Sequence, residues 1–150
     1  MERKRKIIPP VYLVATLGVM TALYFLAPLP RFIEPPYTYL GLVPLVGGIG
    51  MAITATRAFA RAGTPVIPFE RSTMLVTDGL YRVTRNPMYL SMVVILLGVA
   101  LLFGTVGTLL PIPVFAWAIQ RNFIRGEERF LEEIFGEQYL GYKRRVRRWL

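Results

Sequence analysis

A short polar stretch, residues 75–90, holds the side chains with the clearest chemical potential, and it reads LVTDGLYRVTRNPMYL. It contains two arginines, an amide and two tyrosines, namely Arg82, Arg85, Asn86, Tyr81 and Tyr89. Guanidinium groups bind carboxylates and phosphates through paired hydrogen bonds. Pro87 suits the first turn of a helix, whose free N–H groups also favour an anion. The stretch predicts a carboxylate or phosphate site, and the equal alternative is that both arginines anchor a helix end at lipid headgroups.

A second group of candidates begins at Glu127 and Glu128. From residue 131 onward, apolar and aromatic residues recur every three or four positions, which predicts one helix face that includes Tyr139 and Tyr142. Acids in the first turn of a helix are favoured by the helix dipole whatever their function. The functional alternative is a carboxylate that accepts hydrogen bonds from ribose hydroxyls or from an ammonium group.

The 150-residue chain contains no histidine and no cysteine. Disulfides, thiol catalysis and cysteine metal sites are therefore excluded, and so is the commonest general base. We expect no metal site. Any chemistry must depend on Arg, Glu, Asp, Tyr or Asn side chains, on backbone groups, or on a cofactor.

Long apolar runs must position these candidates, because 54% of the residues are hydrophobic. A soluble domain of this length could not bury so much apolar surface. Residues 88–119 carry no charge; as one helix they would extend about 48 Å, against about 30 Å of membrane hydrocarbon. A helical hairpin that turns near residues 103–107 is therefore predicted. Within the second apolar run, Gly47, Gly48 and Gly50 are expected at helix contacts.

These runs predict an all-α integral membrane protein formed by a single domain over residues 1–150. About four transmembrane helices are expected, of which the last two form the hairpin, at residues 7–27, 37–56, 88–103 and 106–124. A polar loop over 62–87 precedes the hairpin. A C-terminal amphipathic interfacial helix over 126–150 is expected to follow it, with an interruption near Gly136 or Gly141.

The net charge of +9 could indicate nucleic-acid binding, but its distribution favours a membrane topology. Most charges fall in residues 2–6, 57–85 and 121–148. With four spans, these three segments lie on one side, which the positive-inside rule makes cytoplasmic. We therefore expect a multi-pass protein with cytoplasmic N- and C-termini and no nucleic-acid partner. The two candidate stretches then lie on the same membrane face and can form one site.

The stretch 75–90 resembles the cofactor motif of the isoprenylcysteine carboxyl methyltransferase family, which is related to the membrane phospholipid N-methyltransferases. The letters EERFL from Glu127, followed by Gly136, Tyr139 and Tyr142, are similar to the second motif of that family. Residues 63–68 resemble the lead-in of small prokaryotic members. The family commonly has histidine where this chain has Asn86, and an amide can donate and accept hydrogen bonds but cannot titrate.

The resemblance implies S-adenosylmethionine as cofactor and a membrane lipid or lipid-linked small molecule as acceptor. It assigns catalytic roles to Arg85, Asn86 and Glu128. It assigns cofactor contacts to residues of both motifs, namely Leu75, Val76, Gly79, Tyr81, Arg85, Asn86, Pro87, Tyr89, Glu127, Glu128, Tyr139 and Tyr142.

The missing histidine bears on the acceptor. A carboxylate is already deprotonated at pH 7 and needs no base, so carboxyl O-methylation of an isoprenylcysteine-like or other lipid-linked acceptor is favoured. Phospholipid N-methylation is the alternative, with Glu70 or Asp78 as a base for the amine. An NADPH-dependent sterol-type reductase is a different enzyme class that resembles the family in its C-terminal half. A non-enzymatic membrane scaffold or transporter would place polar residues on the spans, where the only cluster is Gln120, Arg121 and Asn122.

Overall fold

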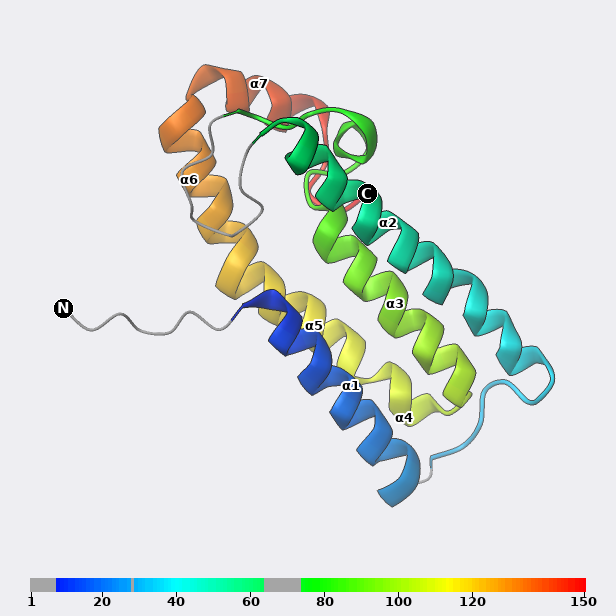
Figure 1. Ribbon diagram of the computed structural model, residues 1–150. Helices are drawn as coiled ribbons and strands as arrows, with labels where there is room; N and C mark the ends of the chain where they lie inside the picture. The colour runs from blue at the N-terminus through cyan, green and yellow to red at the C-terminus, as the bar shows by residue number, and fades with distance from the viewer. Residues whose placement is uncertain (1–7, 28, 64–73) are drawn as a thin grey trace.

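The computed structural model describes residues 8–27, 29–63 and 74–150. Within these residues every regular element is helical (Figure 1), which confirms the all-α prediction. The helices, in chain order, are α1 (Pro9–Leu26), α2 (Leu42–Arg61), α3 (Pro87–Phe103), α4 (Val106–Leu109), α5 (Pro111–Ile119), α6 (Arg125–Phe135) and α7 (Glu137–Arg145). Extended pairing in the described part of the chain is limited to two isolated bridges, Arg31 with Thr105 and Thr84 with Arg147.

Two of the described helices are long and apolar enough to cross a membrane. They are α1, with 18 residues, and the 25-residue unit Tyr37–Arg61, in which a 3₁₀ turn (Tyr37–Gly41) leads into α2. Helix α3 is also apolar but has 17 residues. The four-span topology therefore stays a prediction.

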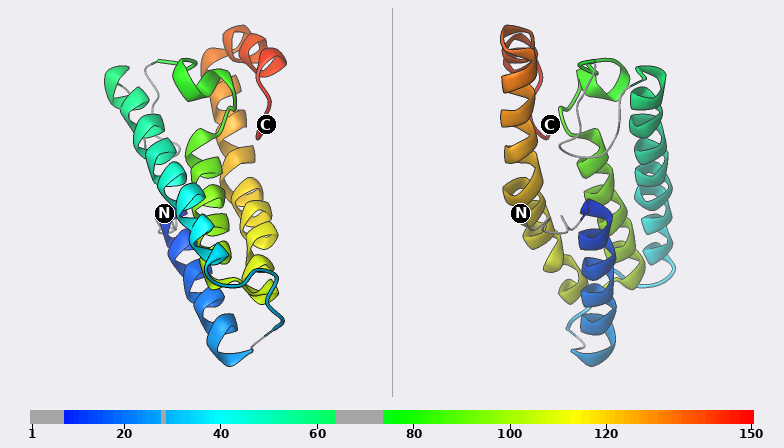
Figure 2. Two further views of the ribbon diagram at one scale, coloured as in Figure 1. Left: turned by 90° about the vertical axis from the view of Figure 1, so that its right-hand side faces the viewer. Right: turned by 60° about the vertical axis from the view of Figure 1, so that its left-hand side comes forward.

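The chain reverses direction at Gly104, between α3 and the helices that follow it. Pro87 occupies the first turn of α3, and Gly104 ends the helix with φ +73°, a left-handed conformation that suits glycine. Helices α4 and α5 are separate because Pro111 lacks the N–H that would continue the first of them. A π-helical turn (Gln120–Ile124) then joins α5 to α6, so that α5, this turn and α6 form one continuous helical rod (Figure 2).

The C-terminal helix predicted over 126–150 is interrupted at Gly136, one of the two expected positions, but it is shorter than predicted. Helix α6 ends at Phe135, before Gly136, whose φ of +48° is unfavourable for other residues, and α7 ends at Arg145. Residues 146–149, here called the strap, leave α7 in an extended conformation at Val146. The helix stops there because the backbone carbonyls of the strap accept hydrogen bonds from residues 84–86 instead of from a further helical turn.

Glycines allow α2 and α3 to approach closely. A Cβ atom at Gly48 would lie 2.9 Å from the Ser91 carbonyl oxygen, and one at Gly98 would lie 2.6 Å from the Leu45 backbone nitrogen. By contrast, a Cβ at Gly47 or Gly50 would have no neighbour within 4 Å in the described part of the chain. Gly48 is therefore a packing position, as expected for a membrane-type helix contact, whereas Gly47 and Gly50 are not.

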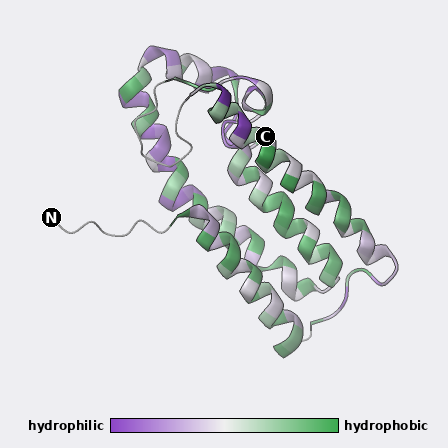
Figure 3. Ribbon diagram, in the orientation of Figure 1, coloured by the Kyte–Doolittle hydropathy of each residue, from purple (hydrophilic) through white to green (hydrophobic). Residues whose placement is uncertain are grey.

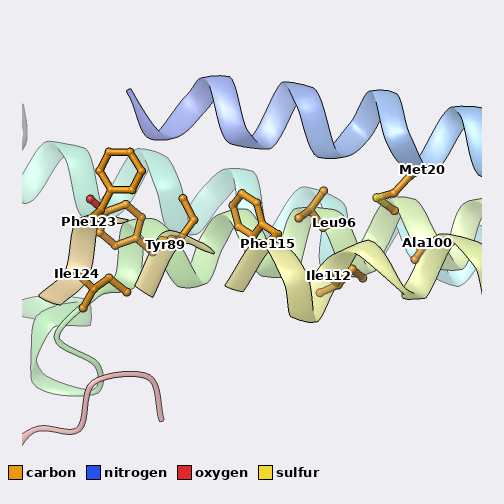
Figure 4. Close-up of a cluster of buried hydrophobic side chains, with 9 residues drawn as sticks. Met20, Tyr89, Leu96, Ala100, Ile112, Phe115, Phe123 and Ile124 are labelled. Carbon is orange, nitrogen blue, oxygen red and sulfur yellow. The ribbon is translucent and has the colours of Figure 1, made fainter. Parts of the chain in front are cut away.

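An apolar core joins α1, α3 and α5, with Met20, Leu96, Ile112 and Phe115 in contact along its length (Figure 4). Hydrophilic residues gather instead at the end of the bundle where α2 ends, α3 begins and α6 and α7 lie (Figure 3). The fold therefore brings the two polar stretches of the sequence to the same end.

Candidate active site

A buried ion cluster surrounds the carboxylate of Glu128, which lies in the first turn of α6. Arg85 Nη1 lies 3.2 Å from Glu128 Oε1, and both side chains are only 8% exposed. Arg148 approaches the same carboxylate with two donors, from Nε to Oε1 at 2.9 Å and from Nη2 to Oε2 at 2.7 Å. The two arginines and one carboxylate give the cluster a formal surplus of one positive charge.

Arg85 is held just ahead of α3 and keeps one donor free. Its backbone N–H donates to the Arg147 carbonyl at 2.9 Å, and Nη1 has a long contact of 3.5 Å with the Tyr139 hydroxyl. Its Nε is buried and has no hydrogen-bond partner among the described residues. A buried donor without a partner costs about 1–3 kcal/mol. A positive cluster with a free donor is suited to an anionic ligand.

A second pair lies beside this cluster. The Tyr89 hydroxyl of α3 donates to Glu127 Oε1 at 2.6 Å. Burial raises the pKa of the Glu127 carboxyl, and the neighbouring Glu128 raises it further, while the hydrogen bond from Tyr89 lowers it. The Tyr89 ring lies near the Phe123 ring, with 6.4 Å between centroids (Figure 4). Both motifs therefore meet twice, through Arg85 with Glu128 and through Tyr89 with Glu127.

Asn86, predicted to be a catalytic and cofactor residue, has a backbone partner in this structure. Its side-chain amide donates from Nδ2 to the Arg148 carbonyl at 3.0 Å, and its side chain is buried. The Thr84 hydroxyl donates to the same carbonyl at 3.1 Å and accepts from the Asn86 backbone N–H at 3.2 Å. Asn86 therefore lies at the site but binds the strap.

Two of the remaining tyrosines connect the two motifs. The Tyr142 hydroxyl donates to the Tyr81 carbonyl at 2.6 Å, and the Tyr81 ring packs edge-on against Phe59 of α2. Burial raises the pKa of both phenols, and it raises the pKa of Tyr139 to about 12. All three phenols are therefore neutral hydrogen-bonding groups at physiological pH.

Not all predicted residues join the ion cluster. Leu75 and Val76 are half-buried in the loop before the 3₁₀ turn Gly79–Arg82, and neither takes part in the hydrogen bonds or ion pairs of the cluster in the described part of the chain. Gly79 is exposed with φ +61°, and Pro87 is buried at the start of α3.

The structure also separates the two arginines that the sequence had grouped. Arg82 is 74% exposed and pairs at 3.0 Å with Asp78, which is 83% exposed. Asp78 therefore lies on the surface and away from the buried carboxylates. The other candidate base, Glu70, and most of the lead-in at residues 63–68 lie outside the described residues.

Two residues of the site were missed by the sequence reasoning, namely Arg148 and Thr84. Arg148 belongs to a basic run of the chain, and the run gives no sign that this arginine alone points inward. Its paired hydrogen bonds to the Glu128 carboxylate distinguish it in the fold, and these hydrogen bonds also raise its pKa.

The fold is therefore that of a helical protein with a buried ion cluster at one end of an apolar bundle. The phospholipid methyltransferase family matches residues 36–138, so the chain belongs to that family. The matched range includes Arg85, Tyr89, Glu127 and Glu128. The resemblance to the isoprenylcysteine carboxyl methyltransferases is also confirmed, because several curated relatives carry that name.

These relatives share about a third of aligned positions with the chain. Protein-S-isoprenylcysteine O-methyltransferase B of Arabidopsis thaliana is 29% identical over 108 residues, 71% of this chain and 55% of the relative. Its counterpart A from the same plant is 33% identical over 94 residues, 63% of this chain and 47% of the relative. An uncharacterized protein of Haemophilus influenzae is 43% identical over 63 residues, 42% of this chain and its own full length. The chain spans about half the length of the two plant relatives, and no solved structure matches it.

Proposed function

We propose that the chain is an integral-membrane methyltransferase that takes a methyl group from S-adenosylmethionine. Its acceptor would be the carboxyl group of an isoprenylcysteine-like or other lipid-linked molecule. The observation that carries this proposal is the buried Arg85–Glu128 pair, which joins the two family motifs at 3.2 Å and leaves Arg85 Nε without a partner in the described residues. Family membership supports the reaction class.

The donor set of the site fits this cofactor. Arg85 Nε is available for the carboxylate of the methionyl group. Glu128 is already held by two guanidinium groups, so Glu127 is the better candidate for an ammonium group or ribose hydroxyls, with Tyr89 fixing its Oε1. When bound, S-adenosylmethionine supplies a methyl group attached to a sulfonium sulfur, and the neutral thioether that remains after transfer is a good leaving group. The chain then needs to orient the reactants and exclude water.

A carboxylate acceptor agrees with the chemistry available in the chain, because it needs no base. Phospholipid N-methylation is the second candidate, and the name of the matching family favours it. In that reaction an amine must lose a proton. Glu127 is the group within the site whose raised pKa suits it to accept one.

An apolar groove between α1 and α5 supports a lipidic acceptor. It has a volume of about 540 Å³ and is lined by residues of both helices and of the α4–α5 junction, namely Val11, Tyr12, Ala15, Thr16, Val19, Leu110, Pro111, Val114, Phe115 and Ala118. At one end Tyr12 packs edge-on against Phe123, which neighbours Tyr89 at the site. A hydrocarbon chain in this groove would therefore approach the site from the apolar side.

We expect the Ala15→Phe substitution to raise the KM for a lipid-linked acceptor about tenfold, because the new ring would fill part of the groove. The KM for S-adenosylmethionine should not change. Methyl-transfer kinetics in detergent micelles measure both values. Ala22→Phe is the matched control, since Ala22 is exposed on the same helix outside the groove. Equal acceptor KM values for the two variants would exclude the groove as the acceptor path.

Polar residues at one end of the bundle also support a multi-pass topology, which we propose to have four spans and cytoplasmic termini. The ion cluster would then face the cytoplasm, where a water-soluble cofactor reaches it without crossing the membrane. A transporter would need the polar cluster of Gln120, Arg121 and Asn122, and all three residues have partners within the chain. The Arg121 guanidinium lies 5.4 Å from the centroid of the Trp117 ring. Gln120 accepts from Trp149 Nε1 at 2.9 Å, and Asn122 donates to the Tyr12 hydroxyl at 3.2 Å.

Calorimetric titration of the purified protein with S-adenosylmethionine, S-adenosylhomocysteine and NADPH separates the alternatives. The methyltransferase is expected to bind both sulfur compounds and not NADPH. Binding of NADPH alone would favour the reductase. Absence of binding by all three compounds would leave the scaffold or transporter and would refute the proposal.

A further inference from the structure

We infer that Arg148 is a positioning residue and that the strap, residues 146–149, forms one wall of the site. Arg148 would act through Glu128, and it would leave Arg85 free for the ligand. This inference rests on the proposed function for the identity of the ligand. The contacts of the strap and of Arg148 do not depend on that identity.

The strap is fixed to the start of α3 by its backbone. The Arg147 carbonyl accepts from the Arg85 N–H at 2.9 Å, and the Arg148 carbonyl accepts from Thr84 Oγ1 at 3.1 Å and Asn86 Nδ2 at 3.0 Å. Thr84 and Asn86 are buried. Trp149 extends the attachment to the π-helical turn by donating from Nε1 to Gln120 Oε1 at 2.9 Å.

The Arg148 side chain satisfies Glu128 almost completely. Its two hydrogen bonds reach both carboxylate oxygens, which is the bidentate arrangement that arginine favours. Arg85 contributes only Nη1 to this carboxylate, at 3.2 Å. Without Arg148, Glu128 would have Arg85 as its one charged partner in the described residues. Arg85 would then turn more of its donors towards Glu128 and offer fewer to a ligand.

The strap also gives the Asn86 side chain a role that needs no change of protonation state. A backbone carbonyl only accepts hydrogen bonds, so the side chain that faces it must donate. The amide of Asn86 donates from Nδ2. An aspartate at this position would instead place a carboxylate against a carbonyl oxygen, whereas a histidine could still donate from a ring nitrogen.

The test uses Trp149 as a reporter, because the chain has two tryptophans and Trp117→Phe leaves Trp149 alone. In that background, Arg148→Ala and Asn86→Asp are expected to shift the Trp149 emission to the red as the indole enters water. Asn86→His should leave the emission unchanged. Arg145→Ala is the charge-matched control, since its side chain is exposed and, among the described residues, bonds only to the Gly141 carbonyl within α7.

The same variants are titrated with S-adenosylhomocysteine in a calorimeter. Arg148→Ala is expected to bind S-adenosylhomocysteine about tenfold to a hundredfold more weakly than the unaltered protein, because it loses hydrogen bonds to a charged group. Arg148→Lys, which keeps the charge but not the planar guanidinium that contacts both carboxylate oxygens, should fall between Arg148→Ala and the unaltered protein. In the Glu128→Gln background, Arg148→Ala should add little, because a residue that acts through Glu128 has nothing further to orient.

Two results would overturn the inference: unchanged Trp149 emission in Arg148→Ala, or affinity for S-adenosylhomocysteine equal to that of the unaltered protein. Failure of the proposed function looks different, because the unaltered protein would then bind no sulfur compound. In that case the emission alone decides whether Arg148 holds the strap.

Discussion

Arg85→Ala is expected to abolish measurable binding of S-adenosylhomocysteine, with a loss of about a hundredfold or more, while the protein stays folded. The loss follows because Arg85 supplies the one buried unpartnered donor found in the described residues and a charge-assisted contact to an anion. The fold survives because Glu128 keeps both hydrogen bonds from Arg148. Calorimetry measures the affinity, and circular dichroism in detergent measures the helix content.

Two further variants make this prediction specific. Arg85→Lys keeps the charge but has neither Nε nor the planar guanidinium, so it should recover less than a tenth of the lost affinity. Arg82→Ala is the control, because Arg82 lies in the same stretch, is 74% exposed and, within the described ranges, pairs only with the exposed Asp78 carboxylate. Equal affinity in Arg82→Ala and Arg85→Ala would mean that the stretch acts through general positive charge, as the headgroup-anchor alternative holds.

Glu128→Ala is expected to cause the largest loss of stability among single substitutions at the site. Removing the Glu128 carboxylate leaves the positive charges of Arg85 and Arg148 next to each other without the negative charge that separates them. The Arg85 side chain is only 8% exposed, so water can do little to screen it. Breaking a buried pair in this way typically costs about 3–5 kcal/mol, and the exposed third of Arg148 reduces that figure because water can reach it. Thermal unfolding of the purified protein in detergent should show a clearly lower Tm.

Glu132→Ala is the matched control, one turn further along α6. Glu132 pairs with Lys143, and both side chains are about one third exposed. Such a pair contributes about 0–1 kcal/mol, so its removal should hardly change the Tm. If both glutamate variants unfolded at the same temperature, the buried cluster would not contribute to the stability of the fold.

Local pattern predicted much of this structure. The uncharged run between the two motifs predicted a turn near residues 103–107, and Gly104 ends α3 there with a positive φ. Pro87 before an apolar run predicted the start of that helix. The charge distribution predicted that the two motifs can form one site, and Arg85 of the first motif forms an ion pair with Glu128 of the second. The signals for the turn and for the helix start lie within a few residues of the feature that they predict.

Long-range partners could not be predicted in the same way. Nothing distinguishes Arg148 from its basic neighbours in sequence, and it differs only because the strap turns back to residues 84–86. The partner of Asn86 is likewise a carbonyl 62 positions away. Arg82 and Arg85 are three residues apart, yet one is on the surface and the other is buried, because the 3₁₀ turn ends between them.

The central claim is methyl transfer from S-adenosylmethionine to a membrane acceptor, and labelled transfer tests it most directly. Membranes that contain the protein are incubated with methyl-labelled S-adenosylmethionine, and lipids and proteins are then extracted separately. The proposal predicts label that depends on Arg85 and that base releases as methanol, as from a methyl ester. Label found only in ethanolamine headgroups would contradict carboxyl methylation and favour the phospholipid reaction. Incorporation no greater than in membranes that contain Arg85→Ala would contradict the methyltransferase itself.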